Sequence, residues 1–387
     1  MPWSRGPMEE RRRMIQRWEQ GATPTELSHE FGVSRQAVYD RIAKWLEAGQ
    51  EGLEDRSRAP HSNSRQTPAK IQQALLNMKD RHPRYGPNKL VRLLADEGIC
   101  LVGPTARDIL KRNGRVNARR ARVTIWSPTG EPHIVVPSAG HSMSADHKGQ
   151  FRMGNGRYCF PLTIADPASR YLFAAQGGTS TNGELAKPVF ERVFREWGMP
   201  EQMITDNGSP FCVSQSIGGI SQLSKWWIKL GIQHVRIKPG RPQQNGIHER
   251  MHRTLKEFCQ APPERNLRAQ QRRTDAFIHE FNHVRPHQAL GQETPASRVE
   301  QYRRPYPEHI GEIEYPRSFE VRRVRTDKCI QWKGELVFVG EVLVGERVAL
   351  TEQDTDHWQL YFGPRHLADW NPVSRKFQRS TQPNEPT

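Results

Sequence analysis

Apolar residues recur at helical spacing through the first part of the chain. Residues 10–47 contain three such segments, and Thr23-Pro24-Thr25-Glu26 opens the second with a capping box and a proline at the first helical position. The apolar positions are Met14, Ile15 and Trp18 in the first segment, Leu27 and Phe31 in the second, and Val38, Ile42 and Leu46 in the third. The pattern predicts three short helices.

The second and third helices are joined at Gly32, a plausible left-handed stop, and Ser34 is placed to cap the third. Two helices with a Gly-containing turn are typical of a helix-turn-helix. Early residues of a recognition helix reach base edges in the major groove, so we predict DNA contacts there. They are Arg35, Gln36, Tyr39 and Arg41. The alternative is a small helical protein–protein module, and the local basic excess favours DNA.

A second group of helical segments follows a region rich in Gly, Ser, Pro and charge. These segments fall between Thr67 and Gly114 and predict another helix-turn-helix-like unit. Its predicted DNA contacts are Arg107, Lys111 and Arg112. Residues 111–122 hold six basic side chains and no acid, among them Arg119 and Arg120. We expect this run to follow DNA phosphates, although basic runs are often only solvated tails.

The pattern changes near residue 140 from helical to alternating. Residues 157–166 and 170–176 predict two strands of a hairpin beside a strand that ends at Asp146. Helical and strand patterns then alternate as far as a helix over residues 269–282. A meander followed by alternation is typical of a mixed sheet with helices on both faces.

From residue 317 the segments become short and alternating, which predicts a small β-barrel. The chain is therefore expected to be multidomain, with N-terminal all-α helix-turn-helix units, a central α/β core and a C-terminal small β-barrel. The predicted divisions are 1–48 for the first helix-turn-helix domain, 49–66 for a linker, 67–125 for the second unit with its basic segment, 135–297 for the core, 298–316 for a connector, 317–371 for the barrel and 372–387 for a disordered tail.

Composition predicts the kind of partner that the protein binds and the compartment in which it works. The 387 residues carry a net charge of +16, and residues 1–125 alone hold 24 Lys and Arg against 14 Asp and Glu. Such a balance favours a polyanionic partner. Five scattered cysteines without a Cys-x-x-Cys argue against a disulfide framework or a four-Cys zinc site and fit a reducing cytosol. No apolar signal or membrane span is visible, so we expect no membrane association and a cytoplasmic, nucleoid-associated protein.

Three acidic residues stand where ligands gather in mixed sheets. Asp146 and Asp206 follow predicted strands, and Glu249 lies on a predicted helix opened by Gly240-Arg241-Pro242. Three carboxylates from two strand ends and a helix can converge on hard divalent cations. Carboxylate ligation without a dedicated His or Cys favours Mg²⁺ or Mn²⁺ over Zn²⁺. His248 and His252 could be ligands or proton shuttles, although plain DNA or packing contacts are the stronger interpretation.

Four motifs occur together between Ser142 and Ser297. In order they are Asp146-His-Lys-Gly, Thr205-Asp-Asn-Gly-Ser, Pro242-Gln-Gln-Asn-Gly-Ile-His-Glu-Arg and Arg285-Pro-His-Gln-Ala-Leu-Gly-Gln-Glu-Thr-Pro. Together they resemble the core of DDE-type bacterial insertion-sequence transposases, which are related to retroviral integrases and have a ribonuclease-H-like fold. Related proteins carry an SH3-like barrel after this core.

The resemblance implies a transposase with two Mg²⁺ or Mn²⁺ per active site. Asp146 would bridge the two cations, Asp206 would hold one and Glu249 the other. The enzyme would bind the element's terminal repeats, free 3′-OH ends and join them to target DNA, as a homodimer or higher oligomer. Helix facing adds candidate phosphate contacts at Lys148, Asn245, Arg253 and Lys256.

Some features depart from the family pattern. Met143 and His147 stand where relatives often have aromatic residues, and the interval from Asp206 to Glu249 is longer than in retroviral integrases. A retroviral-type His/Cys zinc domain is not visible at the N-terminus. Three alternatives stay open: a DNA-binding regulator or domesticated transposase without strand transfer, a nuclease that only hydrolyses, and a structural helical scaffold.

Overall fold

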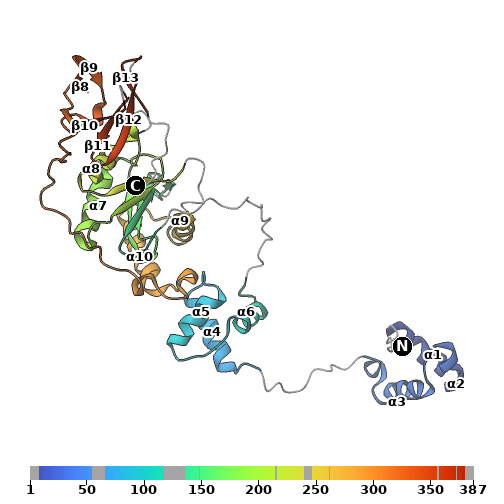
Figure 1. Ribbon diagram of the computed structural model, residues 1–387. Helices are drawn as coiled ribbons and strands as arrows, with labels where there is room; N and C mark the ends of the chain where they lie inside the picture. The colour runs from blue at the N-terminus through green and yellow to red at the C-terminus, as the bar shows by residue number, and fades with distance from the viewer. Residues whose placement is uncertain are drawn as a thin grey trace. The chain divides into compact units, whose positions relative to one another are not determined.

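The computed structural model describes most of the chain (Figure 1). The described residues are 8–54, 66–116, 136–147, 149–213, 216–238, 246–260, 262–354, 357–371 and 373–379. The predicted DNA contacts that fall outside them are Arg119, Arg120, Lys148 and Asn245. The chain divides into two compact units, Met1–Ala69 and Lys70–Thr387.

The first unit has the three predicted helices, α1 (Met8–Glu19), α2 (Pro24–Glu30) and α3 (Arg35–Gly52). The capping box is confirmed, because the Thr23 side chain accepts from the Glu26 N–H while the Glu26 carboxylate accepts from the Thr23 N–H at 2.8 Å. The division predicted at residue 48 is too early. Leu53 is buried in the core of this unit, so the ordered domain reaches into the expected linker.

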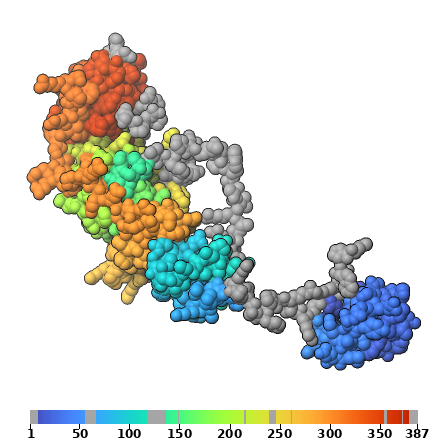
Figure 2. All heavy atoms as spheres, turned by 60° about the horizontal axis from the view of Figure 1, so that its bottom comes forward, coloured from blue at the N-terminus to red at the C-terminus, as the bar shows by residue number. Residues whose placement is uncertain are grey.

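The second helical group comprises α4 (Ala69–Arg81), α5 (Pro87–Asp96) and α6 (Gly103–Arg112). Leu75, Leu90 and Leu94 are fully buried between these helices. Figure 2 shows the group, in cyan, against the orange segment near residue 280, where the Tyr85 hydroxyl is hydrogen-bonded to the Glu280 carboxylate. This group therefore belongs to the same compact unit as the central sheet.

The central sheet consists of strands β1 (Ser142–His147), β2 (Phe151–Arg152), β3 (Tyr158–Ala165), β4 (Leu172–Gly178), β5 (Gln202–Thr205) and β6 (Gln233–Arg236). β4, β3 and β1 pair antiparallel in that order, whereas β1, β5 and β6 pair parallel. The short β2 pairs with the beginning of β3. The expected mixed sheet, a hairpin beside the strand of Asp146, is confirmed.

Helices cover both faces of this sheet (Figure 1). α7 (Gly183–Trp197) and α8 (Gln222–Lys229) share a core with Met143 and Ala145 of β1. α9 (Gly246–Cys259) and α10 (Leu267–His279) share another with β3 and β4, and a π-helical turn, Glu280–Val284, continues α10. Short 3₁₀ turns lie at Ile217–Gly219, Gln288–Leu290, Pro295–Ser297 and Glu341–Leu343.

The C-terminal strands are β7 (Glu320–Arg323), β8 (Cys329–Trp332), β9 (Glu335–Phe338), β10 (Arg347–Asp354), β11 (His357–Phe362), β12 (Arg365–Asn371) and β13 (Lys376–Arg379). They form a five-stranded antiparallel sheet, β13-β12-β11-β10-β7, and a separate β8-β9 hairpin. Within the described residues no pairing closes the strands into the expected barrel. Alternation predicts which side chains face inward, whereas closure depends on strand tilt and stagger, which alternation does not encode.

The segment expected to be a disordered tail contains strand β13. Phe377 of this strand packs with its ring centroid 5.2 Å from that of Trp370 and 6.0 Å from that of Trp332. One aromatic side chain in a polar segment thus provides the contact that orders it. Among the described residues, no helix is both long and apolar enough to cross a membrane.

Candidate active site

Asp146 lies near the end of β1, and Asp206 directly follows β5, the parallel neighbour of β1. The register of the two strands ends with Ala145 of β1 opposite Thr205 of β5, so each aspartate comes directly after one member of this last pair. Adjacent strands are about 4.8 Å apart, and paired positions point to the same face. Met143 and Ala145 face the core beneath α7 and α8, so Asp146 points to the opposite face, where α9 lies.

A tight turn fixes Asp206 at its strand end. Its Oδ1 accepts from the Gly208 N–H at 3.0 Å, and the Asn207 amide donates to the Ile237 carbonyl at 2.7 Å, just beyond β6. A Cβ at residue 208 would stand 3.1 Å from Asp206 Oδ2, which explains the glycine in this turn. The Asp-Asn-Gly sequence therefore positions the carboxylate.

Two histidines of α9 contact the strand of Asp146. His248 and His252 are one helical turn apart and both are buried. His248 Nε2 lies 2.7 Å from Ser144 Oγ, and its Nδ1 lies 3.4 Å from Thr163 Oγ1. Burial lowers the pKa of His248 to about 4, with the Ser144 contact opposing the shift, so the ring is neutral near pH 7.

Thr163 of β3 joins both histidines to the aspartate. Its hydroxyl donates to the Asp146 carbonyl at 2.9 Å and lies 2.8 Å from His252 Nε2. His252 Nδ1 in turn lies 3.9 Å from Asp146 Oδ2. Both ring nitrogens of His248 and Nε2 of His252 are thus occupied by hydroxyl groups, which favours a positioning role over metal ligation and agrees with the stronger sequence interpretation.

The structure does not gather the three predicted acids into one group. Among the described residues, the ligand atoms that lie within 4.8 Å of one another are those of Asp146, His248 and His252. Asp206 is partly buried just after β5, and Glu249 is exposed in the first turn of α9. Residues 239–245, which include the predicted opening of this helix at Pro242, lie outside the described residues.

Sequence analysis missed the two hydroxyl groups of this network. Ser144 alternates with the core-facing Met143 and Ala145, and Thr163 faces Asp146 in the β1–β3 register. The sequence did contain one indication of this network, which is the presence of small polar residues in otherwise apolar strands. Neither could be paired with a histidine before the register of the strands was known.

The predicted DNA contacts fall into two groups by exposure. The exposed ones are Arg35, Gln36, Tyr39, Arg107, Lys111, Arg112, Arg253 and Lys256. Arg41 differs, because its Nη1 lies 3.5 Å from Met14 Sδ and burial lowers its pKa. It stands two positions beyond the exposed Tyr39, and α3 turns its side chain toward α1, so a structural role is the better interpretation of Arg41.

Comparison with known proteins assigns these regions. Two family models, each described as an integrase core domain, match residues 137–242 and 230–295. A helix-turn-helix domain model matches residues 10–61, and a homeodomain-like domain model matches residues 37–110. The core containing Asp146, Asp206 and Glu249 is thus covered by integrase models, and the helices before it by DNA-binding models.

Individual relatives agree with this assignment. The chain is 25% identical over 232 residues to an uncharacterized 39.2 kDa protein of insertion element IS476 from Xanthomonas euvesicatoria, covering 59% of this chain and 64% of the relative. It is 35% identical over 178 residues to the Gag-Pol polyprotein of Koala retrovirus, covering 44% of this chain and 10% of that one. The chain therefore spans less than two thirds of the length of these relatives.

A solved structure is also similar. The HTLV-2 integrase catalytic core domain, determined in complex with magnesium, matches 42% of this chain and 99% of its own, with 14% identity and a TM-score of 0.33. The assignment depends on the sequence matches, which join integrase core models, helix-turn-helix models and an insertion-element relative in one chain. The chain thus combines helix-turn-helix domains with an integrase core domain, and the matches support a transposase whose core resembles that of retroviral integrases.

Proposed function

We propose that this protein is an active DNA transposase of its insertion sequence. It binds the element's terminal repeats, cleaves to free 3′-OH ends and joins those ends to target DNA. The observation that supports this most is the placement of Asp146 and Asp206 at the ends of two adjacent parallel strands, with Asp146 beside the helix that contains Glu249. The ends of DNA strands can approach this face, because Glu249 and the basic side chains around it are exposed.

The residues fit divalent cations of the magnesium type. The two aspartates and Glu249 offer carboxylate oxygens, which Mg²⁺ and Mn²⁺ prefer, whereas the nearby imidazoles are engaged with Ser144 and Thr163. A pair of bound cations would stabilise the attacking and leaving oxygens of an in-line phosphoryl transfer. Asp146, Asp206 and Glu249 would hold them.

The protein's own contribution is to fix these acids. The hydroxyl of Thr163 and the ring of His252 hold the segment around Asp146, and the turn at Gly208 holds Asp206. Glu249 directly follows His248, which contacts Ser144 of β1, so the backbone of Glu249 stands beside the strand of Asp146. Rigid support of this kind is what positions reacting groups in phosphoryl transfer.

DNA recognition is assigned to the exposed side chains of the helical units. Arg35, Gln36 and Tyr39 would read base edges from the beginning of α3, and Arg107 with Lys111 would contact DNA from α6. Lys256, with the residues Arg119, Arg120, Lys148 and Asn245 outside the described part, would contact phosphates. Synapsis of two element ends would require at least a homodimer.

The test is strand transfer of a labelled element end into a plasmid, with Mg²⁺ and with EDTA. Products are expected with Mg²⁺ only. Asp146→Asn, Asp206→Asn and Glu249→Gln should each lower transfer about 100-fold or more, because each removes charge from the reacting centre. Glu257→Gln, which removes an exposed acid from the same helix, is the matched control and should leave transfer unchanged.

Each alternative predicts a different outcome of this assay. Cleavage without joined products would indicate a nuclease that only hydrolyses. Specific DNA binding by the wild-type protein, with neither cleavage nor joining in Mg²⁺ or Mn²⁺, would indicate a DNA-binding regulator and refute the transposase proposal.

A further inference from the structure

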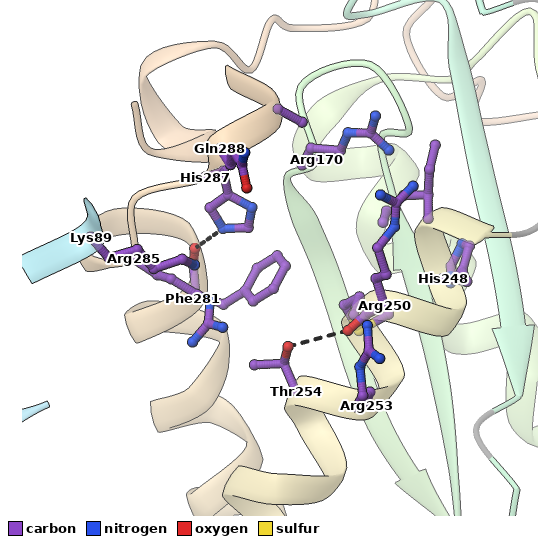
Figure 3. A pocket seen from close by; sticks show the side chains of 14 residues that line it. Lys89, Arg170, His248, Arg250, Arg253, Thr254, Phe281, Arg285, His287 and Gln288 are labelled. Atoms are coloured by element: carbon purple, nitrogen blue, oxygen red, sulfur yellow. Dashed lines mark hydrogen bonds between the residues drawn. The ribbon is translucent and has the colours of Figure 1, made fainter. Parts of the chain in front are cut away.

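A basic pocket lies on the other flank of α9 (Figure 3). It has a volume of about 290 Å³ and is formed by α5, α9, the turn between β3 and β4, and the segment after α10. His248 lines this pocket and also belongs to the group around Asp146. The pocket is therefore a direct neighbour of the candidate active site.

Five cationic side chains line the pocket. They are Lys89, Arg170, Arg250, Arg253 and Arg285. Of the described residues that line it, none is acidic. The four arginines also form no ion pair with a carboxylate elsewhere in the described part of the chain. Figure 3 shows that these cations come from three sides, with Arg170 opposite Lys89 and Arg285, so that an anion between them would meet several donors.

This concentration of positive charge opposes folding when no anion is present. Burial, and next the neighbouring Arg250, lower the pKa of Arg170, whereas Asp166 opposes the shift, and the Arg170 Nε is buried without a hydrogen-bond partner. Burial, and next Arg285, lower the pKa of Lys89 to about 8. Arg170 also has a left-handed backbone, with φ of 65°. Such strain and charge repulsion gather at functional sites more often than at purely structural ones.

The pocket is held in shape by a cation–π contact and by hydrogen bonds. The guanidinium of Arg285 stacks over the Tyr85 ring at 5.2 Å, and the Tyr85 hydroxyl is bonded to Glu280. His287 Nε2 lies 3.3 Å from the Phe281 carbonyl oxygen, and Thr254 donates to the Arg250 carbonyl at 3.2 Å. The cations are therefore presented by a framework that joins α5 to the core.

We propose that this pocket binds a backbone phosphate of the DNA strand whose end enters the active site. Arginine forks match phosphate oxygens in pairs, and Lys89 adds a point charge. The inference rests on the proposed function for the identity of the strand, but the binding site itself requires only DNA. It adds Lys89, Arg170, Arg250 and Arg285 to the DNA contacts.

The experiment compares full-length variants on a labelled duplex of about 30 base pairs, with affinity measured by fluorescence anisotropy across a salt series. The double variant Arg170→Gln with Arg250→Gln removes two pocket charges. The matched control, Arg268→Gln with Arg272→Gln, removes two exposed charges from α10. The pocket variant should bind at least tenfold more weakly, and its salt slope should fall by about 2, while the control should change far less.

Equal weakening of both double variants would overturn the proposal, because it would mean that only overall charge matters. Arg170→Lys with Arg250→Lys should restore part of the affinity. The single variant Arg253→Gln, at an exposed position, supplies the same comparison if the double variant is unfolded by circular dichroism. A thermal shift of the wild type by inorganic phosphate that matches the shift by DNA would identify a free-phosphate site and also overturn it.

The outcome is separate from that of the transposase proposal. Asp146→Asn should bind the duplex like the wild type, because the pocket is intact. If strand transfer is absent from the wild type while the pocket variant still loses DNA affinity selectively, the catalytic proposal fails and the phosphate site stands. If strand transfer occurs but the pocket variant binds DNA normally, the phosphate site is refuted and the catalytic proposal stands.

Discussion

At the scale of single residues, Thr163 is the centre of the site. One buried hydroxyl contacts the Asp146 carbonyl and both α9 histidines. A valine has the same shape but can neither donate nor accept. The site therefore depends on a residue that takes no part in the chemistry.

Thr163→Val should lower the free energy of unfolding by about 1–3 kcal/mol, because it leaves buried imidazole nitrogens without partners. Urea denaturation followed by fluorescence measures this. Thr274→Val is the control, since the buried Thr274 hydroxyl donates mainly to the Gln270 carbonyl of its own helix. The explanation would be wrong if the two variants were equally stable.

The three acids could be selected from sequence, because each stands in a recognisable motif at a strand end or on a helix, and their joint role as metal ligands stays a prediction. Their supporting network could not be predicted. Ser144 and Thr163 become partners of His248 and His252 only through the β1–β3 register and the packing of α9. The basic pocket was also missed, because Lys89, Arg170 and Arg285 come from three distant segments.

At the scale of elements, side-chain amides bind the outer edge of β4. Asn282 accepts from the Leu172 N–H and donates to its carbonyl, both at 2.9 Å. Gln271 of α10 accepts from the Gly177 N–H at 2.8 Å and donates to the Ala175 carbonyl at 3.1 Å. These two amides replace a neighbouring strand, and they hold α10 and the turn after it to the sheet.

Asn282→Ala should destabilise the core by about 2 kcal/mol or more, because it leaves two buried backbone groups unpaired. Thermal unfolding and hydrogen exchange at Leu172 would report the loss. Asn113→Ala, which removes an amide bonded to a carbonyl of its own helix, should cost less than about 1 kcal/mol. A normal exchange rate at Leu172 in the Asn282 variant would contradict the assigned role.

The capping box of α2 was predicted from four letters of sequence and is present. Thr23→Ala should cost the N-terminal unit about 1 kcal/mol, because it leaves an N–H at the helix start without an acceptor. Hydrogen exchange in α2 of the full-length protein is the measurement. Thr25→Ala, at an exposed position two residues later, should be close to neutral, and equal effects would argue against the cap.

Local patterns thus predicted most elements but not how some of them end or assemble. The helix expected over 269–282 ends as α10 at His279 and continues as a π-helical turn, which places Asn282 against β4. Strand alternation after residue 317 predicted the strands, whereas the separate β8-β9 hairpin reflects long-range pairing. Both the end of α10 and the pairing of β8 with β9 depend on tertiary contacts, which local patterns do not encode.

At the scale of the whole molecule, the C-terminal sheets pack on the integrase core. Ile228 of α8 belongs to the same apolar cluster as Leu350 and Phe362. Beside it, Glu346 accepts from Lys229 at 3.0 Å and lies 3.6 Å from Lys225. These ion pairs are largely shielded, since the three side chains are 17–21% exposed.

Glu346→Gln should weaken this attachment, because two shielded lysines lose their shared counter-charge; a loss of about 1–3 kcal/mol is expected. Calorimetry should then resolve a separate, earlier transition of the C-terminal sheets. Glu341→Gln breaks the exposed pair with Lys328 and should cost less than about 1 kcal/mol. A single, unshifted transition in the Glu346 variant would show that apolar packing alone attaches the sheets.

The amides on β4 also restrict how copies of this chain can associate. At the opposite margin of the core sheet, Arg365 donates to the His234 carbonyl of β6 at 3.4 Å. Strand addition at either margin would have to displace these side chains. Multimers formed on DNA should consequently join at the core through side-chain surfaces rather than by adding a strand to this sheet, and should remain separable into folded protomers.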